Sequence, residues 1–308
     1  MTARAQAAWR LFSAPATIGG RRYPSIGLVL LAAIGACFLI VVAVGRWGAG
    51  QDQEAYWQGA RRLLDGLPLY DPTATSVTPF AYWYPPPLAQ VLVPVAAVVP
   101  ARIFDLAWVA LLLGCLLWMA RWRPLVALAY VAFVPVAVEL WFDNVHLVLA
   151  ALIVLGIRRW PWAFTIGAAI KIAPGLGILY LLLRRRWREA GIAIGLGLVI
   201  LIVSVVIGPN AWSGFLTTIG ARGPADISGF LPIPYVIRLV AAVGLTVLAA
   251  TMKPRWGEPL LVVAITVALP TLWLNALATL IAIVPIASRR GLAADEDEPV
   301  GVGIGLRP

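Results

Sequence analysis

Residues 26–45 read IGLVLLAAIGACFLIVVAVG and contain no charged side chain. A helix needs about 20 predominantly apolar residues to cross the hydrocarbon core of a bilayer, so this stretch predicts a transmembrane helix that ends near Arg46. Arg21 and Arg22 lie just before it. Basic residues that flank a transmembrane helix favour the cytoplasmic side. The helix is therefore expected to begin inside the cell, and the chain from residue 47 onward to emerge outside.

The composition extends this prediction to the whole chain. Of its 308 residues, 61% are hydrophobic and only 12% are charged, whereas about a quarter of the residues in a soluble domain carry charge. No soluble fold hides this much apolar surface, so lipid must be the solvent. Further apolar segments follow at residues 102–120, 124–141, 147–157, 191–208, 235–251, 259–270 and 271–287. Together with two short segments near residue 171, they predict an all-α polytopic membrane protein of about ten transmembrane helices.

The net charge of +10 has two readings. In a soluble protein it would suggest nucleic-acid binding. Here the arginines gather in short turns between apolar segments, at residues 121–123, 158–159 and 184–188. This is the pattern of cytoplasmic loops, so we expect membrane lipids, and no nucleic acid, as partners. The same rule predicts a multi-pass protein of the cell membrane with its N- and C-termini in the cytoplasm.

Polar and proline-rich stretches suggest the domain organisation. We expect residues 1–25 to form a cytoplasmic leader before an uncleaved signal-anchor, and residues 26–288 to form one transmembrane catalytic domain. Two long outer loops interrupt this domain, at residues 47–101 and 209–234. Residues 289–308 are rich in acidic residues and glycines, a composition typical of a disordered tail.

The first outer loop carries two candidate surface helices. Tyr56, Ala60, Leu63 and Leu64 fall on one face of residues 52–65, which is typical of an amphipathic helix on a membrane surface. Residues 88–99 are apolar but too short to span, and we expect a half-buried helix there.

Asp52 opens the first of these helices and has two readings. It can cap the helix, or it can act as a general base on a hydroxyl group. Its position alone favours the cap.

Lys171 is the second candidate residue. Two short apolar segments, 161–171 and 174–183, meet at the sequence Lys171-Ile172-Ala173-Pro174. A hairpin that keeps the flanking arginine clusters inside brings Lys171 to the outer half of the membrane. Half-length helices with a polar residue at their tip usually line a cavity, and a lysine within the membrane is a functional candidate. The alternative is a lysine that extends towards a lipid headgroup.

A third polar group, Asp143, Asn144 and His146, is expected at the outer surface between two crossings. His146 can hydrogen-bond a sugar hydroxyl or assist proton transfer, or it can face lipid headgroups. It is the only histidine of the chain, and both cysteines lie within apolar stretches. This set of residues offers no zinc cluster, so we expect no metal or other cofactor, and a divalent metal at Asp143 is not favoured.

Aromatic residues and arginines complete the candidate set. The aromatic side chains of the first loop are Tyr56, Trp57, Tyr82, Trp83 and Tyr84. Sugars stack on aromatic faces, but Trp and Tyr also populate the interfacial belt of membrane proteins. The belt is the favoured reading, with Tyr56 the exception because it shares a helical side with Asp52. Arg222 and Arg238 flank the second outer loop and can bind phosphate, or they can be ordinary interfacial arginines.

The motifs of the first loop resemble those of glycosyltransferase family 87. After Asp52 the chain reads ARRLLDGLPLYD at 60–71, followed by Pro79-Phe80, YPP at 84–86 and Pro94. The family pattern is an acid at the start of the loop, a helix that ends in G-x-P-x-Y-D, and then Y-P-P. All three parts occur here in order and with matching spacing.

Two later positions continue the resemblance, which covers roughly residues 26–190. The sequence Asn144-Val145-His146-Leu147 stands where the family often has Gln-x-Asn-Leu, so the chain departs from the pattern at Asn144 and His146. Lys171 and Pro174 match the K-x-x-P that precedes a basic turn in the family.

The resemblance implies a fold of the GT-C type and a polyprenyl-phosphate sugar donor, as in the mannosyltransferases that build phosphatidylinositol mannosides. It implies that Asp52 is the catalytic base for an acceptor hydroxyl, which attacks C1 of the sugar with inversion. Lys171 would bind the donor phosphate, and Arg222 is a further candidate for that role. The residues assigned to the sugar or the acceptor are Tyr56, Tyr84, Asn144 and His146.

The function expected from the sequence is transfer of a hexose, with mannose favoured, to a lipid or polysaccharide acceptor outside the membrane. An alternative is a transporter or flippase of a lipid-linked sugar, which should show paired discontinuous helices in two related halves. The sequence contains one such pair, near Lys171, and no convincing internal repeat. A non-catalytic partner subunit is a third reading, and it would tolerate Asp52→Asn.

Overall fold

The computed structural model describes residues 13–18, 21–45, 52–71, 73–74, 78, 80–221 and 233–288. Apart from one short hairpin, the regular elements of these residues are helical. The elements of the first half are β1 (Ala16–Ile18), β2 (Arg21–Tyr23), α2 (Ile26–Gly45), α3 (Asp52–Leu64), α4 (Pro86–Val98), α5 (Ala101–Met119), α6 (Pro124–Val131), α7 (Val134–Phe142) and α8 (His146–Arg158). Those of the second half are α9 (Ala163–Ile170), η1 (Ala173–Gly175), α10 (Leu176–Leu183), α11 (Trp187–Ile207), α12 (Pro209–Ala221), α14 (Tyr235–Thr251), α15 (Pro254–Val267), η2 (Leu274–Ala282) and α16 (Ile283–Ser288).

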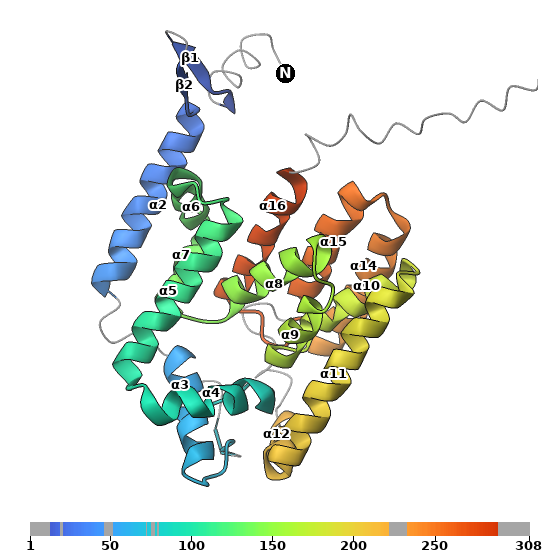
Figure 1. Cartoon of the computed structure of the whole chain (residues 1–308). Coiled ribbons are helices and arrows are strands. Elements are labelled where there is room, and N and C mark those ends of the chain that lie inside the picture. The colour runs from blue at the N-terminus through green and yellow to red at the C-terminus, as the bar shows by residue number, and fades with distance from the viewer. Residues whose placement is uncertain are drawn as a thin grey trace, which may run out of the picture.

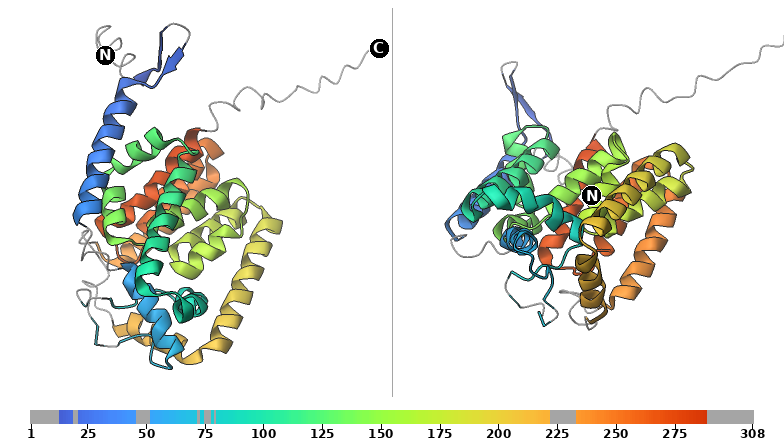
Figure 2. Two further views of the ribbon diagram at one scale, coloured as in Figure 1. Left: turned by 60° about the vertical axis from the view of Figure 1, so that its left-hand side comes forward. Right: turned by 60° about the horizontal axis from the view of Figure 1, so that its bottom comes forward.

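The helices pack in pairs around a buried centre. Helix α2 packs on α6, α3 on α4, and α14 on α15, while α8 contacts α5, α9 and η2. Figure 1 shows α3, α4 and α12 gathered at one end of the molecule, with the β1–β2 hairpin and the end of α16 at the other. Figure 2 shows α2 and α11 on opposite sides of the bundle. Helix α2 therefore starts, and α16 ends, at the same end of the molecule.

Three helices are long and apolar enough to cross a membrane, by length and composition among the described residues. They are α2, α5 and α11, and α6 with α7 would make a fourth if a bent pair counts as one span. This confirms a helical membrane protein, but it does not confirm about ten crossings of full length. The remaining apolar helices, including α4, α8 and α14, have only 10–17 residues.

The segment 124–141, predicted as one crossing, is broken. Helices α6 and α7 meet at an angle of 89°, with Phe133 in an extended conformation between them. Pro135 lies in the first turn of α7. A proline has no N–H to donate and clashes with the preceding turn, so it starts a helix and does not continue one. A single unbroken helix over this segment is therefore excluded, and the segment counts as one crossing only if the bent pair is one span.

The segment predicted as the second outer loop, 209–234, contains a helix. Residues 209–221 form helix α12, and the remainder of the loop, 222–232, lies outside the described residues. Pro209 begins the helix, a position where proline is favoured. Phe215 of α12 is buried against Tyr70 of the first loop, with ring centroids 5.8 Å apart. The two segments predicted as outer loops therefore contact each other.

The predicted pair of short helices around Lys171 is confirmed. Helix α9 ends at Ile170, and η1 and α10 follow from Ala173. Lys171 itself is extended, with φ −139° and ψ 131°. Pro174 stands in the first turn of η1 and explains the break. The interruption leaves Lys171 at the tip of a half-length helix, next to the start of α8.

Candidate active site

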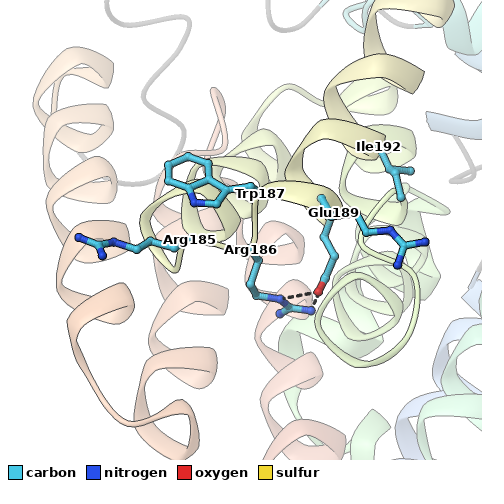
Figure 3. Close-up of a pocket in the computed structure, with 6 residues that line it drawn as sticks. Arg185, Arg186, Trp187, Glu189 and Ile192 are labelled. Carbon is cyan, nitrogen blue, oxygen red and sulfur yellow. Dashed lines mark hydrogen bonds and ion pairs between the residues drawn. The ribbon is translucent and has the colours of Figure 1, made fainter.

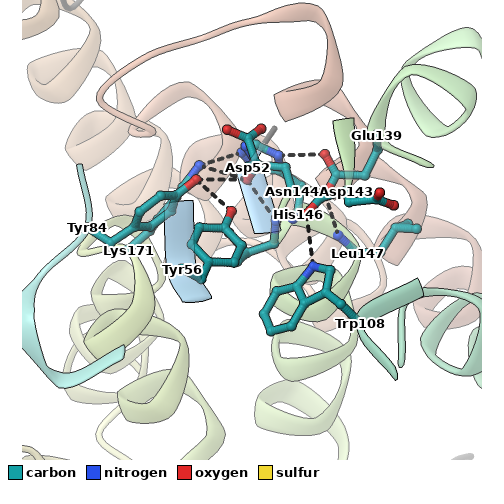
Figure 4. Close-up of polar contacts among 11 residues, drawn as sticks. Asp52, Tyr56, Tyr84, Trp108, Glu139, Asp143, Asn144, His146, Leu147 and Lys171 are labelled. Atoms are coloured by element: carbon teal, nitrogen blue, oxygen red, sulfur yellow. Dashed lines mark hydrogen bonds and ion pairs between the residues drawn. The ribbon is translucent and has the colours of Figure 1, made fainter. Parts of the chain in front are cut away.

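Four chain segments meet in one polar cluster (Figure 4). Asp52 is the first residue of α3, Tyr84 lies just before α4, and Lys171 follows α9. Asn144 and His146 lie at the start of α8. Each residue is therefore at a helix end, where the backbone leaves polar groups in need of partners. The structure brings together six of the seven residues that the sequence analysis assigned to the site.

Asn144 is the centre of this cluster. Its amide Nδ2 donates to Asp52 Oδ2 at 2.5 Å. Its Oδ1 accepts from Lys171 Nζ at 3.3 Å and from the Tyr84 hydroxyl at 3.2 Å. One amide thus joins the candidate base to the candidate phosphate-binding cation.

Lys171 fixes the tautomer of His146. Lys171 Nζ lies 2.9 Å from His146 Nε2, and an ammonium group can only donate. Nε2 must therefore accept, so the ring proton is on Nδ1, which lies 2.9 Å from Glu139 Oε2. Two of the three N–H donors of the Lys171 ammonium are therefore engaged, one by His146 Nε2 and one by Asn144 Oδ1. The ammonium also lies 5.0 Å from the centroid of the Tyr84 ring, within cation–π distance.

Glu139 is the residue that the sequence analysis missed. Its side chain is fully buried on α7. Besides the His146 ring, its Oε1 accepts from the backbone N–H groups of His146 at 2.5 Å and Leu147 at 3.4 Å, so it caps the start of α8. A signal was present, because Glu139 is the one acidic residue in the apolar segment 124–141, and such residues are functional candidates.

Asp143, Asn144 and His146, predicted at the outer side of the membrane between two crossings, are all buried within the protein. Asp143 ends α7 in the left-handed conformation, with φ 51°, which costs a non-glycine residue about 1 kcal/mol or more. This turn directs the start of α8 into the fold. Trp108 of α5 donates its Nε1–H to the Asp143 carbonyl at 2.8 Å and helps to hold the turn.

The interfacial-belt reading is wrong for Tyr82 and Tyr84, which are buried, and Tyr56, the expected exception, is buried as well. Tyr56 donates to the Tyr84 hydroxyl at 2.8 Å, and its ring lies 4.9 Å from that of Tyr84 and 5.0 Å from that of Trp108. A buried tyrosine needs a partner for its hydroxyl. The partners of Tyr56 and Tyr84 belong to the cluster, whereas Tyr82 donates to the Pro85 carbonyl. The rings of Tyr56 and Tyr84 form one wall of the site.

Asp52 has an acid–base property suited to its predicted role. Its side chain keeps partial contact with solvent, but burial raises its pKa to about 6. The hydrogen bond from Asn144 and the charge of Lys171 act in the opposite direction and limit the rise. Above pH 6 the carboxylate is therefore ionised, yet it is more basic than an ordinary aspartate.

Of the two arginines that flank the predicted second outer loop, only Arg238 is described, and its hydrogen bonds lie outside this cluster. Arg222 lies outside the described residues. Arg238 is buried, and its guanidinium donates to the carbonyls of Leu269 at 2.8 Å and Pro270 at 2.7 Å. These bonds close the end of α15, where carbonyls lack helical partners. Arg238 thus has a structural role.

A metal site is not evident in the described part of the chain, where no three His, Cys, Asp or Glu side chains are grouped to hold an ion. The polar cluster contains instead the carboxylates of Asp52 and Glu139, with the ammonium of Lys171 between them. Such a set can accept a proton at Asp52 and neutralise an anion at Lys171.

Comparisons with known proteins agree with this chemistry. A curated relative from Mycobacterium tuberculosis, a polyprenol-phosphate-mannose-dependent alpha-(1-2)-phosphatidylinositol mannoside mannosyltransferase, is 31% identical over 218 residues. The aligned part covers 59% of this chain and 51% of the relative, so the chain spans about half the length of that protein. No solved structure matches.

The sequence model of glycosyltransferase family 87 matches residues 82–294. This range begins after Asp52 and includes Tyr84, Glu139, Asn144, His146 and Lys171. It also extends to the end of the helical domain, beyond the range of about 26–190 over which the motifs were recognised. The match covers more than half of the chain, and this chain therefore belongs to glycosyltransferase family 87.

Proposed function

We propose that this protein is a membrane hexosyltransferase that moves mannose from a polyprenyl-phosphate donor to a lipid or glycan acceptor on the outer face. Membership of family 87 and the curated mannosyltransferase relative support the reaction class and the donor. The observation that carries the proposal is the bridge from Asp52 through Asn144 to Lys171. It joins a base and a cation, the two groups that transfer from a sugar phosphate needs.

The proposed reaction is a single displacement. Asp52 accepts the proton of the acceptor hydroxyl, and the oxygen attacks C1 of the sugar. The bond between C1 and the phosphate oxygen breaks, the configuration inverts, and the prenyl phosphate leaves with the electron pair. Lys171 binds that phosphate through its third N–H, the one not engaged by Asn144 or His146 in the described structure. Catalysis then rests on positioning and charge neutralisation.

The other site residues act mainly by position. Asn144 orients the Asp52 carboxylate, and His146, held by Glu139, orients the Lys171 ammonium. Tyr56 and Tyr84 form the aromatic wall against which a sugar ring can stack. Arg222 is retained as a proposed phosphate ligand from the second outer loop.

The proposed topology follows from the arginine-rich turns. We place the ends of α5, α8 and α10, where these turns lie, in the cytoplasm. Helices α3, α4 and α12 then lie on the outer face of the cell membrane, and both chain termini lie inside. The short apolar helices complete further crossings of a GT-C type fold, up to about ten, as interrupted spans that line the site.

The direct test is sugar transfer by the purified protein. With radiolabelled polyprenyl-phosphate mannose and an extract of membrane lipids, we expect a labelled glycolipid on thin-layer chromatography. Glucose and arabinose donors on the same carrier serve as controls for sugar identity. Transfer from one of those donors alone would overturn mannose. Movement of the intact donor across a liposome bilayer without transfer would favour the flippase.

The raised pKa of Asp52 predicts the acid limb of the pH–rate profile. A general base must be ionised before it accepts a proton. With a pKa of about 6, Asp52 is protonated below pH 6 and ionised above it. We expect kcat/KM to fall about tenfold for each pH unit below ~6 and to level off above ~7. Initial rates measured across this range would contradict the assignment if they were unchanged through pH 6 or rose as the pH fell.

A further inference from the structure

A groove lies between α5 and α8, with α16 beside it, and the mechanism above does not use it. Its volume is about 830 Å³, within the range of about 300–1,000 Å³ that is usual for ligand sites. The groove runs from Ala110 on α5 to the turn at Arg121 and Trp122. Its lining is mostly apolar along this length and basic at one end. This combination suits a molecule with an apolar chain and an anionic head.

Gly114 lines the groove and leaves open space there because it has no side chain. It lies in the interior of α5, where glycine is about 1 kcal/mol less favourable than alanine. A Cβ added at Gly114 would meet no heavy atom within 4 Å. Close packing against another described helix therefore does not explain this glycine. By contrast, a Cβ at Gly35 of α2 would overlap the Leu128 carbonyl of α6, so that glycine is required by packing.

The mouth of the groove carries exposed cations and tryptophans. Arg121 and Arg159 are both exposed there. The guanidinium carbon of Arg159 lies 5.0 Å from the centroid of the Trp160 ring. Trp118 and Trp122 are also exposed beside them. Tryptophan and arginine together mark the level of lipid headgroups in membrane proteins. In the described structure no hydrogen bond or ion pair engages the Arg121 guanidinium.

The backbone at the mouth of the groove is strained at Arg121 and Trp122. Arg121 and Trp122 both have φ 58°, a conformation that favours glycine at the end of a helix. The N–H of Trp122 bonds the Leu117 carbonyl at 2.8 Å and closes the turn. An arginine at this position costs stability that a glycine would not. Arg185 adopts the same conformation after α10, so this type of helix end is not particular to the groove.

We propose that this groove binds an anionic phospholipid, with one acyl chain along α5 over Gly114 and the phosphate on Arg121 and Arg159. The donor phosphate is not the ligand of these arginines. Trp108 contacts the active-site cluster, and Arg121 lies 13 residues further along the chain, roughly 20 Å at the helical rise of 1.5 Å per residue. One phosphate cannot contact both places. The groove is thus a second lipid site at the opposite end of α5.

A second basic hollow provides the matched control. It lies at the turn from α10 to α11 and has a volume of about 440 Å³. Arg185 there has φ 57° and closes the same kind of helix-ending turn as Arg121. Figure 3 shows the Arg186 guanidinium paired with Glu189, whereas Arg185 points away from them. Arg185→Gly therefore removes one charge and one strained residue, as Arg121→Gly does, but away from the groove.

The test is lipid binding to the full-length protein, measured by native mass spectrometry with dioleoyl phosphatidylglycerol and, separately, dioleoyl phosphatidylcholine. We expect the anionic lipid to bind more tightly. Arg121→Gly and Arg159→Gln should each weaken its binding about fivefold, the effect of one arginine near an anionic headgroup. Gly114→Leu should block the chain and weaken binding at least as much. This variant should fold, since the space above Gly114 is open and leucine favours a helix.

The controls separate this site from general charge and from the donor. Arg185→Gly should leave phosphatidylglycerol binding unchanged, as should Gly195→Leu, a substitution at an exposed glycine of α11 with open space above it. Equal binding of the two lipids would overturn the proposal, as would equal losses for Arg121→Gly and Arg185→Gly. It would also fail if Gly114→Leu left lipid binding intact but raised the KM for the sugar donor. In that case the groove would hold the prenyl chain.

Discussion

Asp52→Asn is expected to lower kcat for sugar transfer by about 10²–10⁴-fold, the contribution of a general base. The substitution keeps the size of the side chain, and the new amide oxygen can still accept the hydrogen bond from Asn144 Nδ2. What it removes is the group that accepts the acceptor's proton. The protein should therefore remain folded, with a melting temperature close to that of the wild type. Rates with a radiolabelled donor and an excess of acceptor would measure the effect.

Glu54→Gln is the matched control for Asp52→Asn. Glu54 lies in the same first turn of α3 and accepts a hydrogen bond from Gln58, away from the cluster. It should retain nearly full activity. If Asp52→Asn kept full transfer, the base assignment would fail. If both variants lost activity equally, negative charge at the start of α3 would be the cause, and proton transfer would not.

Lys171→Met is expected to reduce kcat/KM by about 10²–10³-fold, the usual effect of removing one charged or polar donor from a site of developing negative charge. Methionine keeps much of the length and the apolar stem of lysine. The leaving phosphate loses its counter-charge, and His146 Nε2 and Asn144 Oδ1 lose a donor. Steady-state kinetics with varied donor concentration would give the effect on kcat and KM separately.

Lys253→Met provides the control, because Lys253 is exposed and is the only other lysine of the chain. It should leave the kinetics unchanged. The melting temperature of Lys171→Met must be measured as well, since Lys171 is the cation nearest Asp52 and Glu139 in the cluster. A folded Lys171→Met protein with wild-type kcat/KM would exclude Lys171 from phosphate binding.

The fold could be predicted from the sequence where length and apolarity act alone. Helices α2, α5 and α11 follow continuous apolar segments, and their positions match the prediction closely. The prediction was incomplete at prolines, which can end one helix or begin another. Pro135 and Pro209 both start helices here, so the first interrupts a predicted crossing and the second begins a helix within a predicted outer loop. A proline is disfavoured in the interior of a helix, but its position does not show whether the helix precedes it or follows it in the chain.

The residues of the candidate site could be identified individually, because each is a polar residue next to an apolar segment. Their contacts could not be predicted, since Asp52 and Asn144 are 92 residues apart in the chain. The left-handed turn at Asp143 directs the start of α8 into the fold. Aspartate adopts this conformation more readily than most residues, but the residue type alone does not predict it. Glu139 was missed because its neighbours are apolar, although an isolated acid in such a segment is itself informative.

The bridge through Asn144 also sets an order of events during synthesis. Asp52 leaves the ribosome first, Asn144 follows 92 residues later, and Lys171 another 27 residues after that. At about 5–20 residues per second, the wait is on the order of ten seconds. During that interval α3 is complete, but its acid has neither its amide nor its cation. The cluster thus forms only after Lys171 has left the ribosome, and a nascent chain halted before residue 171 would hold the candidate base without its counter-charge.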